Sequence, residues 1–158
     1  MKHSQIHQHV LNLLDFKGAH LAFDEAVRGL APELRGKKIK GAPHTIWQLV
    51  EHMRIAQWDI LEFSRNANHI SPKFPEGYWP ELAAPSSDAS WKKSTGAFRS
   101  DLEDMRRLVA DADEEELYAQ IPHGEGQTLL REALLVADHN SYHLGQLVML
   151  RKLLGAWR

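Results

Sequence analysis

Residues 128–154 read TLLREALLVADHNSYHLGQLVMLRKLL, and this stretch decides the fold class. Apolar side chains recur in it every three or four residues, which is the period of an amphipathic helix. Because successive helix residues turn by about 100°, the face can be drawn directly. It carries Glu132, Leu135, Val136, His139, Tyr142, His143, Gln146, Leu150 and Leu153. Two histidines therefore stand in the middle of an apolar stripe that is expected to face the interior of a bundle.

Other segments have the same helical periodicity, and none alternates convincingly as a strand does. We expect further helices over residues 4–30, with a break near Gly18, over 45–65 and over 90–110, and a short helical turn over 113–118. Thr45 and Gln48 have the spacing of a capping box, which starts the second helix sharply. The pattern predicts an all-α fold, a four-helix bundle that occupies residues 1–158 as a single domain.

Residues 66–90 interrupt this pattern with four prolines, at positions 72, 75, 80 and 85. Prolines at this density exclude a regular helix. A connection of this length in a compact domain is often a lid or a binding loop. Tyr78 and Trp79 are therefore candidates to close over a substrate. The alternative, with equal weight, is a crossover whose aromatic side chains fill one end of the bundle.

The composition excludes several classes of function. The formal net charge is −2, so nothing attracts the chain to nucleic acid or to anionic lipid. There is no cysteine, so a transition metal would have to be bound by histidine and carboxylate. The first residues are polar, without a signal core, and no apolar run is long enough to cross a bilayer. We therefore expect a cytoplasmic protein with no nucleic-acid and no membrane partner.

Three histidines are candidate metal ligands. His139 and His143 are four residues apart, so their rings lie on adjacent turns of the last helix. His52 stands at the edge of the second helix's apolar stripe and can reach a neighbouring helix. Such a set would bind a divalent transition metal and leave coordination positions open, as catalytic sites do. The alternatives are a metal that only braces the bundle and a metal-free hydrogen-bond network. His3 and His7 share the spacing, but we expect a solvated helix start there.

Two motifs together resemble the DinB-like (YfiT-like) superfamily of metal-dependent hydrolases. They are WQLVEH at residues 47–52 and HNSYHLGQL at residues 139–147. The resemblance implies a four-helix bundle, usually dimeric, with one Ni or Zn ion on three histidines, which here are His52, His139 and His143. Relatives include thiol-dependent transferases and a thiol-dependent maleylpyruvate isomerase.

The function that we predict is that of a metal-dependent hydrolase, or of a thiol-dependent transferase acting on a small molecule with a low-molecular-weight thiol. The alternative is a non-catalytic metal-binding or structural bundle with an interaction role.

Other polar residues are weaker candidates. Glu132 and Gln146 share the histidine face, so either could orient a histidine ring or contact substrate. The alternatives are that Glu132 serves the N-terminal dipole of its helix, which we favour, and that Gln146 bridges helices. Asp59 and Glu62 could supply a general base, but Asp59 lies about 120° from the core stripe, so we expect both to be solvated. Gly145 is expected to allow a close helix approach.

The last helix also carries a second apolar strip, roughly opposite the histidine face. Its members are Leu130, Leu134, Ala137, Leu144 and Val148. A bundle helix with one buried stripe should be polar there, so the strip predicts a homodimer with this helix at or near the interface. Cover by the Pro-rich segment is the competing explanation.

Overall fold

The computed structural model describes residues 4–157. All regular elements in this range are helices. They are α1 (Gln5–Leu14), α2 (Phe23–Val27), α3 (Pro32–Arg35), α4 (Ile46–Arg65), the 3₁₀ turn η1 (Glu76–Tyr78), α5 (Asp88–Asp111), α6 (Glu114–Tyr118) and α7 (Leu129–Leu153). One isolated bridge, Gln120 to Thr128, is the only strand-like pairing in the described range. None of these helices is both long and apolar enough to cross a bilayer. The all-α prediction is confirmed.

The long helices begin at side-chain caps that satisfy their first backbone N–H groups. The backbone N–H of Gln48 donates to Oγ1 of Thr45 at 3.2 Å, and the amide of Thr45 donates back to Oε1 of Gln48 at 3.0 Å. The hydroxyls of Ser87 and Thr128 cap α5 and α7 in the same position. The predicted capping box is confirmed, and the helices expected from residue 45 onward are present with ends shifted by at most two residues.

The first region is helical and is interrupted near Gly18, as predicted. It consists of two short helices, α1 and α2, and a third, α3, follows beyond the expected end at residue 30. The chain leaves α1 at Asp15, and Phe16 follows with a φ of 56°, which a right-handed helix cannot contain. Residues 15–22 therefore form a connection that redirects the chain before α2.

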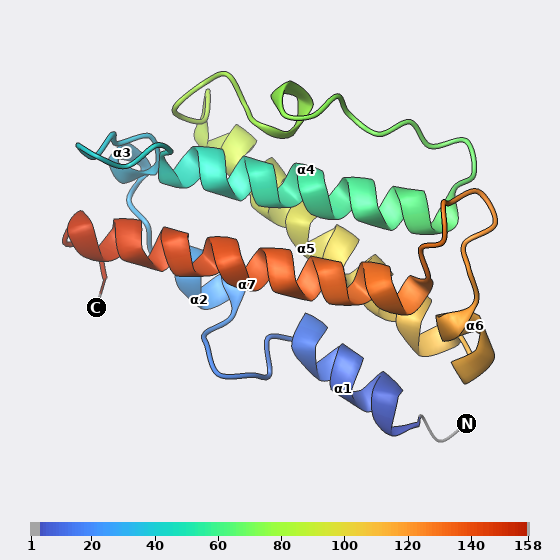
Figure 1. The fold of residues 1–158 in the computed structure, drawn as a ribbon. Helices are drawn as coiled ribbons and strands as arrows, with labels where there is room; N and C mark the ends of the chain where they lie inside the picture. The colour runs from blue at the N-terminus through green and yellow to red at the C-terminus, as the bar shows by residue number, and fades with distance from the viewer. Residues whose placement is uncertain (1–3, 158) are drawn as a thin grey trace.

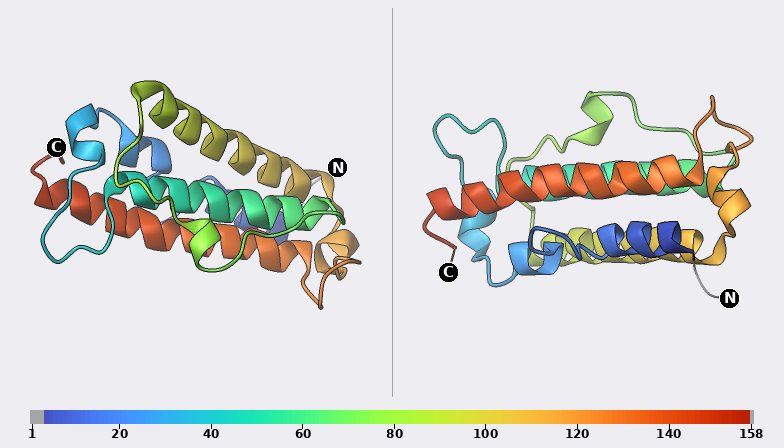
Figure 2. Two further views of the ribbon diagram at one scale, coloured as in Figure 1. Left: turned by 90° about the horizontal axis from the view of Figure 1, so that it is seen from above. Right: turned by 60° about the horizontal axis from the view of Figure 1, so that its bottom comes forward.

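α4 and α7 run antiparallel, side by side, with α5 behind α4 and α1 against α5 and α7 (Figure 1). α2 packs on α7 toward its C-terminal half, beyond the reach of α1, so α1 and α2 together take the fourth position of the bundle. Residues 66–87, here called the strap, return along the outside of α4 (Figure 2). As predicted, the strap contains no regular helix beyond the single turn η1.

A chain of buried amides fixes the register of the three long helices. Nε2 of Gln57 in α4 donates to the carbonyl of Phe98 in α5 at 2.7 Å, and Nδ2 of Asn140 in α7 donates to Oε1 of Gln57 at 2.8 Å. Gln57 and Asn140 are each 1% exposed. Leaving such a group unpaired costs about 1–3 kcal/mol, so this chain resists rotation of α7. It thereby fixes the direction of the neighbouring His139.

The second apolar strip of α7 lies inside the chain, so the prediction that it forms an exposed interface is wrong. Ala137 and Leu144 are buried, and Leu130 and Val148 pack against the two core clusters. Within that strip only Leu134, at 40%, is exposed. α7 contacts α1, α2, α4, α5 and α6. Helices of the same chain therefore cover the face of α7 that was expected to be free in a simple four-helix bundle.

His7 also differs from the expected solvated position. It is buried, and its Nε2–H donates to the carbonyl of Ala112 at 2.9 Å. His3, its predicted companion, lies outside the described residues. The bond joins the start of α1 to the chain beyond α5, which helps to close that end of the bundle.

Leu144→Ala tests whether this strip is core. We expect the free energy of unfolding to fall by about 2–5 kcal/mol, the usual cost of truncating a buried leucine. Leu134→Ala, on the same helix but partly exposed, should cost about 0.5 kcal/mol or less. Chemical denaturation of the two variants makes the comparison. Equal, small losses would show that Leu144 is not packed in the core.

Candidate metal centre

Three histidine rings meet between α4 and α7. Nε2 of His52 lies 3.1 Å from Nε2 of His143 and 3.0 Å from Nε2 of His139. The three residues form a group whose possible ligand atoms all lie within 4.8 Å of one another. The helical spacing of four residues places His139 and His143 on adjacent turns of α7, and His52 reaches them from α4.

Hydrogen bonds at the opposite ring nitrogens decide what the Nε2 atoms can do. Nδ1 of His52 is 2.9 Å from the carbonyl oxygen of Tyr78, and Nδ1 of His143 is 2.8 Å from Oε1 of Gln146. Both oxygens only accept, so each Nδ1 carries the proton. A neutral imidazole has one ring proton, and Nε2 of His52 and Nε2 of His143 therefore both present lone pairs.

Two lone pairs at 3.1 Å cannot hydrogen-bond to one another, and this bears on the metal-free alternative. Nε2 of His139 can donate to His52, which would satisfy one of the two short contacts. Nε2 of His143 then still faces His52 without a hydrogen between them. A cation shared by the three nitrogens removes this conflict, so the donor set fits a metal ion.

Burial keeps these rings neutral. It lowers the pKa of His139 to about 3 and, against the hydrogen bond to Tyr78, the pKa of His52 to about 4. Burial also lowers the pKa of His143, against its hydrogen bond to Gln146. Proximity of the rings adds to the effect, because a second positive charge is unfavourable beside the first. Neutral imidazole is the form that binds metal.

The strap forms one wall of the centre. The indole of Trp79 lies parallel to the ring of His52, with centroids 3.8 Å apart and planes at 1°. It also stacks on His44, again at 3.8 Å. Together with the Tyr78 carbonyl, these contacts fix both the plane and the tautomer of His52.

A buried carboxylate holds the strap in place. Oδ2 of Asp59 accepts from the Tyr78 hydroxyl at 2.6 Å, and Oδ1 accepts from Nε2 of His69 at 2.7 Å. Burial and the carboxylate raise the pKa of Tyr78 to about 12, so the hydroxyl stays protonated and donates. At the far end of the strap, the hydroxyl of Thr45 donates to the carbonyl of Ala83 at 2.6 Å. The expectation that Asp59 is solvated is therefore wrong, since it is 8% exposed.

The sequence signature of the DinB superfamily matches residues 16–147. The chain belongs to the DinB superfamily. No curated protein and no solved structure matches it. The matched range contains His52, His139 and His143, and it also contains the whole strap.

The other predicted polar residues of this DinB-superfamily protein divide between the centre and the helix end. Gln146 contacts a histidine directly, through Nδ1 of His143. Glu132 is buried in the first turn of α7 and pairs with Arg131 at 2.6 Å. This position at the N-terminal end of the helix dipole agrees with the alternative that we favoured for Glu132. Glu62 is half-buried and pairs with Arg65. Tyr78 and Trp79 contact the centre from the strap.

Three residues around the centre were not predicted: His44, Asp59 as a buried group, and His69. Asp59 follows His52 by seven residues, which is about two helical turns, so this spacing was an available signal. His44 precedes the cap of α4, and His69 lies in the strap. No helical period fixes the direction of a side chain at such positions.

Tyr78→Phe tests how the strap is held. It removes a hydrogen bond to a charged acceptor, which is worth about 1.5–3 kcal/mol, and should raise the rate of trypsin cleavage after the exposed Lys73 roughly tenfold. Tyr118→Phe, at an exposed tyrosine in α6, is the matched control. Unchanged cleavage in Tyr78→Phe would show that Asp59 does not hold the strap.

The lowered histidine pKa values predict a dependence of stability on pH. As the pH falls from 6.5 toward about 4 for His52 and about 3 for His139, these histidines are protonated in the unfolded chain but stay neutral in the folded one, so the metal-free protein loses stability. Thermal melts in the presence of chelator measure this. His139→Gln should have a shallower dependence than the parent, and equal slopes would contradict the pKa assignment.

Proposed function

We propose that His52, His139 and His143 bind one divalent transition metal ion, Ni or Zn. The observation that carries the proposal is the pair of Nε2 lone pairs, on His52 and His143, that face each other at 3.1 Å. Imidazole is a preferred ligand of both metals. The sequence contains no cysteine and therefore no thiolate ligand, which leaves histidine and carboxylate as the ligands for such a metal.

We further propose that the chain is a metal-dependent enzyme that acts on a small molecule, as a hydrolase or a thiol-dependent transferase. A metal held by three protein ligands with an open position lowers the pKa of a bound water or thiol and so supplies a nucleophile. The protein's own residues hold the ligands, through Tyr78 and Gln146, and cover one side of His52 with Trp79.

His44 is the proposed proton acceptor beside the centre. It stacks on Trp79 and lines a groove that also contains Gln146. Burial lowers the pKa of His44, so its ring is largely neutral at pH 7 and can take up a proton. Within residues 4–157 no carboxylate hydrogen-bonds to the three histidines, and none lines the groove beside them, which favours histidine over Asp or Glu for this role.

A homodimer remains a proposal that rests on the resemblance to the superfamily. The buried strip of α7 gives it no support, and we assign no interface.

The test of the metal site is elemental analysis of protein purified without chelator. We expect about one equivalent of Ni or Zn per chain, and less than about a tenth of it in His139→Ala. His9→Ala, at an exposed histidine of α1, is the control and should keep the full content. Absence of stoichiometric metal in the parent protein, even after reconstitution, would contradict the proposal.

The test of the reaction uses the metal-loaded protein. Low-molecular-weight thiols are paired with electrophiles, and simple esters and amides are offered without thiol. Turnover that requires thiol and is lost in His143→Ala supports the transferase; thiol-independent turnover that is lost in that variant supports the hydrolase. Activity that persists in His143→Ala would mean that this centre is not the catalyst.

A further inference from the structure

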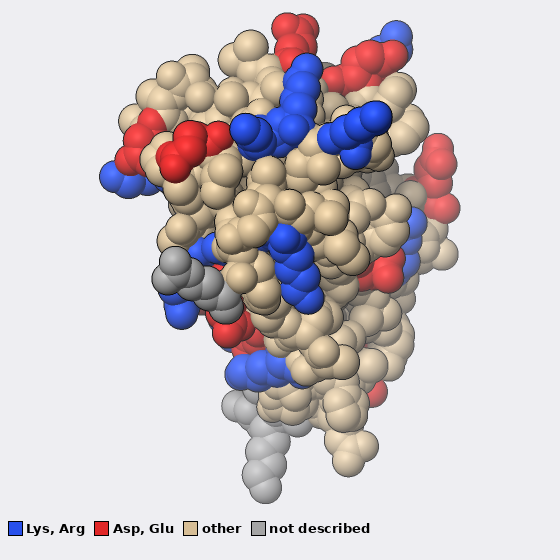
Figure 3. Space-filling view, turned by 90° about the vertical axis from the view of Figure 1, so that its left-hand side faces the viewer, with Lys and Arg blue, Asp and Glu red and all other residues tan. Residues whose placement is uncertain are grey.

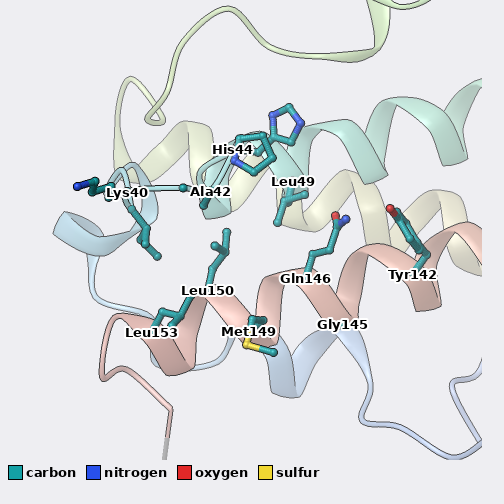
Figure 4. Close-up of a pocket in the computed structure, with 13 residues that line it drawn as sticks. Lys40, Ala42, His44, Leu49, Tyr142, Gly145, Gln146, Met149, Leu150 and Leu153 are labelled. Atoms are coloured by element: carbon teal, nitrogen blue, oxygen red, sulfur yellow. The ribbon is translucent and has the colours of Figure 1, made fainter.

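A groove runs along the outside of α7, between this helix and the connection of residues 39–44. Its volume is about 580 Å³, within the range of sites for small molecules. Ile39 and Ala42 of the connection and Leu49 of α4 line it opposite Met149, Leu150 and Leu153 of α7. Met149 and Leu153 are 57% and 63% exposed, although they are large and apolar. Figure 4 shows these side chains around an open space.

One end of the groove reaches the residues that surround the three histidines. Gln146, whose Oε1 accepts from His143, lines it there. The ring of Tyr142 packs on the ring of His143 with centroids 4.9 Å apart, and His44 stacks on Trp79. In Figure 4, Tyr142 and Gln146 lie at the end opposite Lys40 and Leu153. The groove is thus polar next to the histidines and apolar along its middle, with Lys40 at the outer end.

The lining of the groove carries positive but no negative charge. No aspartate or glutamate lines the groove, and Lys40, at its outer end, is its one charged residue. On the end of the molecule that carries α3, acidic side chains lie mainly toward the margins, and Lys and Arg side chains occupy the middle (Figure 3). A cationic ligand would therefore meet no partner in this groove, whereas a neutral or anionic one meets no repulsion.

Gly145 leaves the floor of the groove open. It lies within α7, where glycine costs about 1 kcal/mol relative to alanine. The expectation that it allows a close helix approach is wrong, because a Cβ built there has no neighbour within 4 Å. Packing does not require glycine at this position. Gly145 borders this groove next to Gln146 and also borders a second hollow beside Leu21 and Val148, so a larger side chain there would occupy space at the edge of the groove.

We propose that this groove binds the apolar body of the substrate: a hydrophobic small molecule, neutral or anionic but not cationic, whose reacting polar group lies toward Gln146. The inference rests on the proposed function for the identity of the reacting end, but binding in the groove does not require the metal. The expected substrates are alkyl or aryl compounds, and protonated amines are excluded because the groove has no acidic side chain.

The experiment measures binding of decanoate by titration calorimetry to the metal-free and the metal-loaded protein, with decylammonium as the matched cation. We expect decanoate to bind both forms and decylammonium to bind at least severalfold more weakly. Gly145→Leu should weaken decanoate binding at least tenfold. Gly96→Leu is the matched control, because Gly96 is also an exposed helix glycine with no neighbour at its Cβ and does not line the groove.

Both glycine replacements should preserve the fold and the metal content, since each adds a side chain in open space. No decanoate binding, or equal binding by Gly145→Leu and the parent, would overturn the inference while the metal proposal stands. Conversely, failure of metal binding with decanoate still bound would remove the proposed function alone. Light scattering that shows a dimer, dissociated by Gly145→Leu, would assign the groove to a second copy and overturn the inference.

Discussion

The centre depends on where two protons lie, on Nδ1 of His52 and on Nδ1 of His143. The Tyr78 carbonyl and the Gln146 amide oxygen accept these protons, so the lone pairs on the two Nε2 atoms are turned toward one another. Without those two acceptors, the rings could change tautomer and settle as an ordinary hydrogen-bonded pair. A buried polar atom left without a partner costs about 1–3 kcal/mol, and a ligand that accepts several lone pairs at once, such as the proposed metal ion, would remove this cost.

One of the two acceptors comes from outside the bundle helices. Tyr78 belongs to the strap, which is held by Asp59 through the Tyr78 hydroxyl and His69. Asp59 lies in α4, on the same helix as His52, so both ends of this linkage are fixed to one rigid element. An irregular segment can position a histidine ring in this way, because it is hydrogen-bonded to the same helix that carries the ring.

Much of this was readable in the sequence because it depends on single helices. The cap at Thr45, the start of the last helix near Thr128 and the spacing of His139 and His143 follow from local geometry. The burial of Leu144 does not, because a helical wheel gives the direction of a side chain but not the number of neighbouring helices. α7 is surrounded by five helices, so it is apolar on two sides without a partner chain. Asp59 was misplaced for a related reason, since the strap that buries it has no period.

The position of α7 also explains why the histidines lie beside an open surface. Its buried faces pack on other helices, and three of its exposed large apolar side chains, Tyr142, Met149 and Leu153, border the groove. His143 lies between the two regions, buried itself but in ring contact with the exposed Tyr142. A centre deeper in the bundle would be closed, and one on the outer face would lose the burial that keeps its imidazoles neutral. The boundary between core and groove meets both requirements of the proposed metal site, access from outside and neutral imidazole rings.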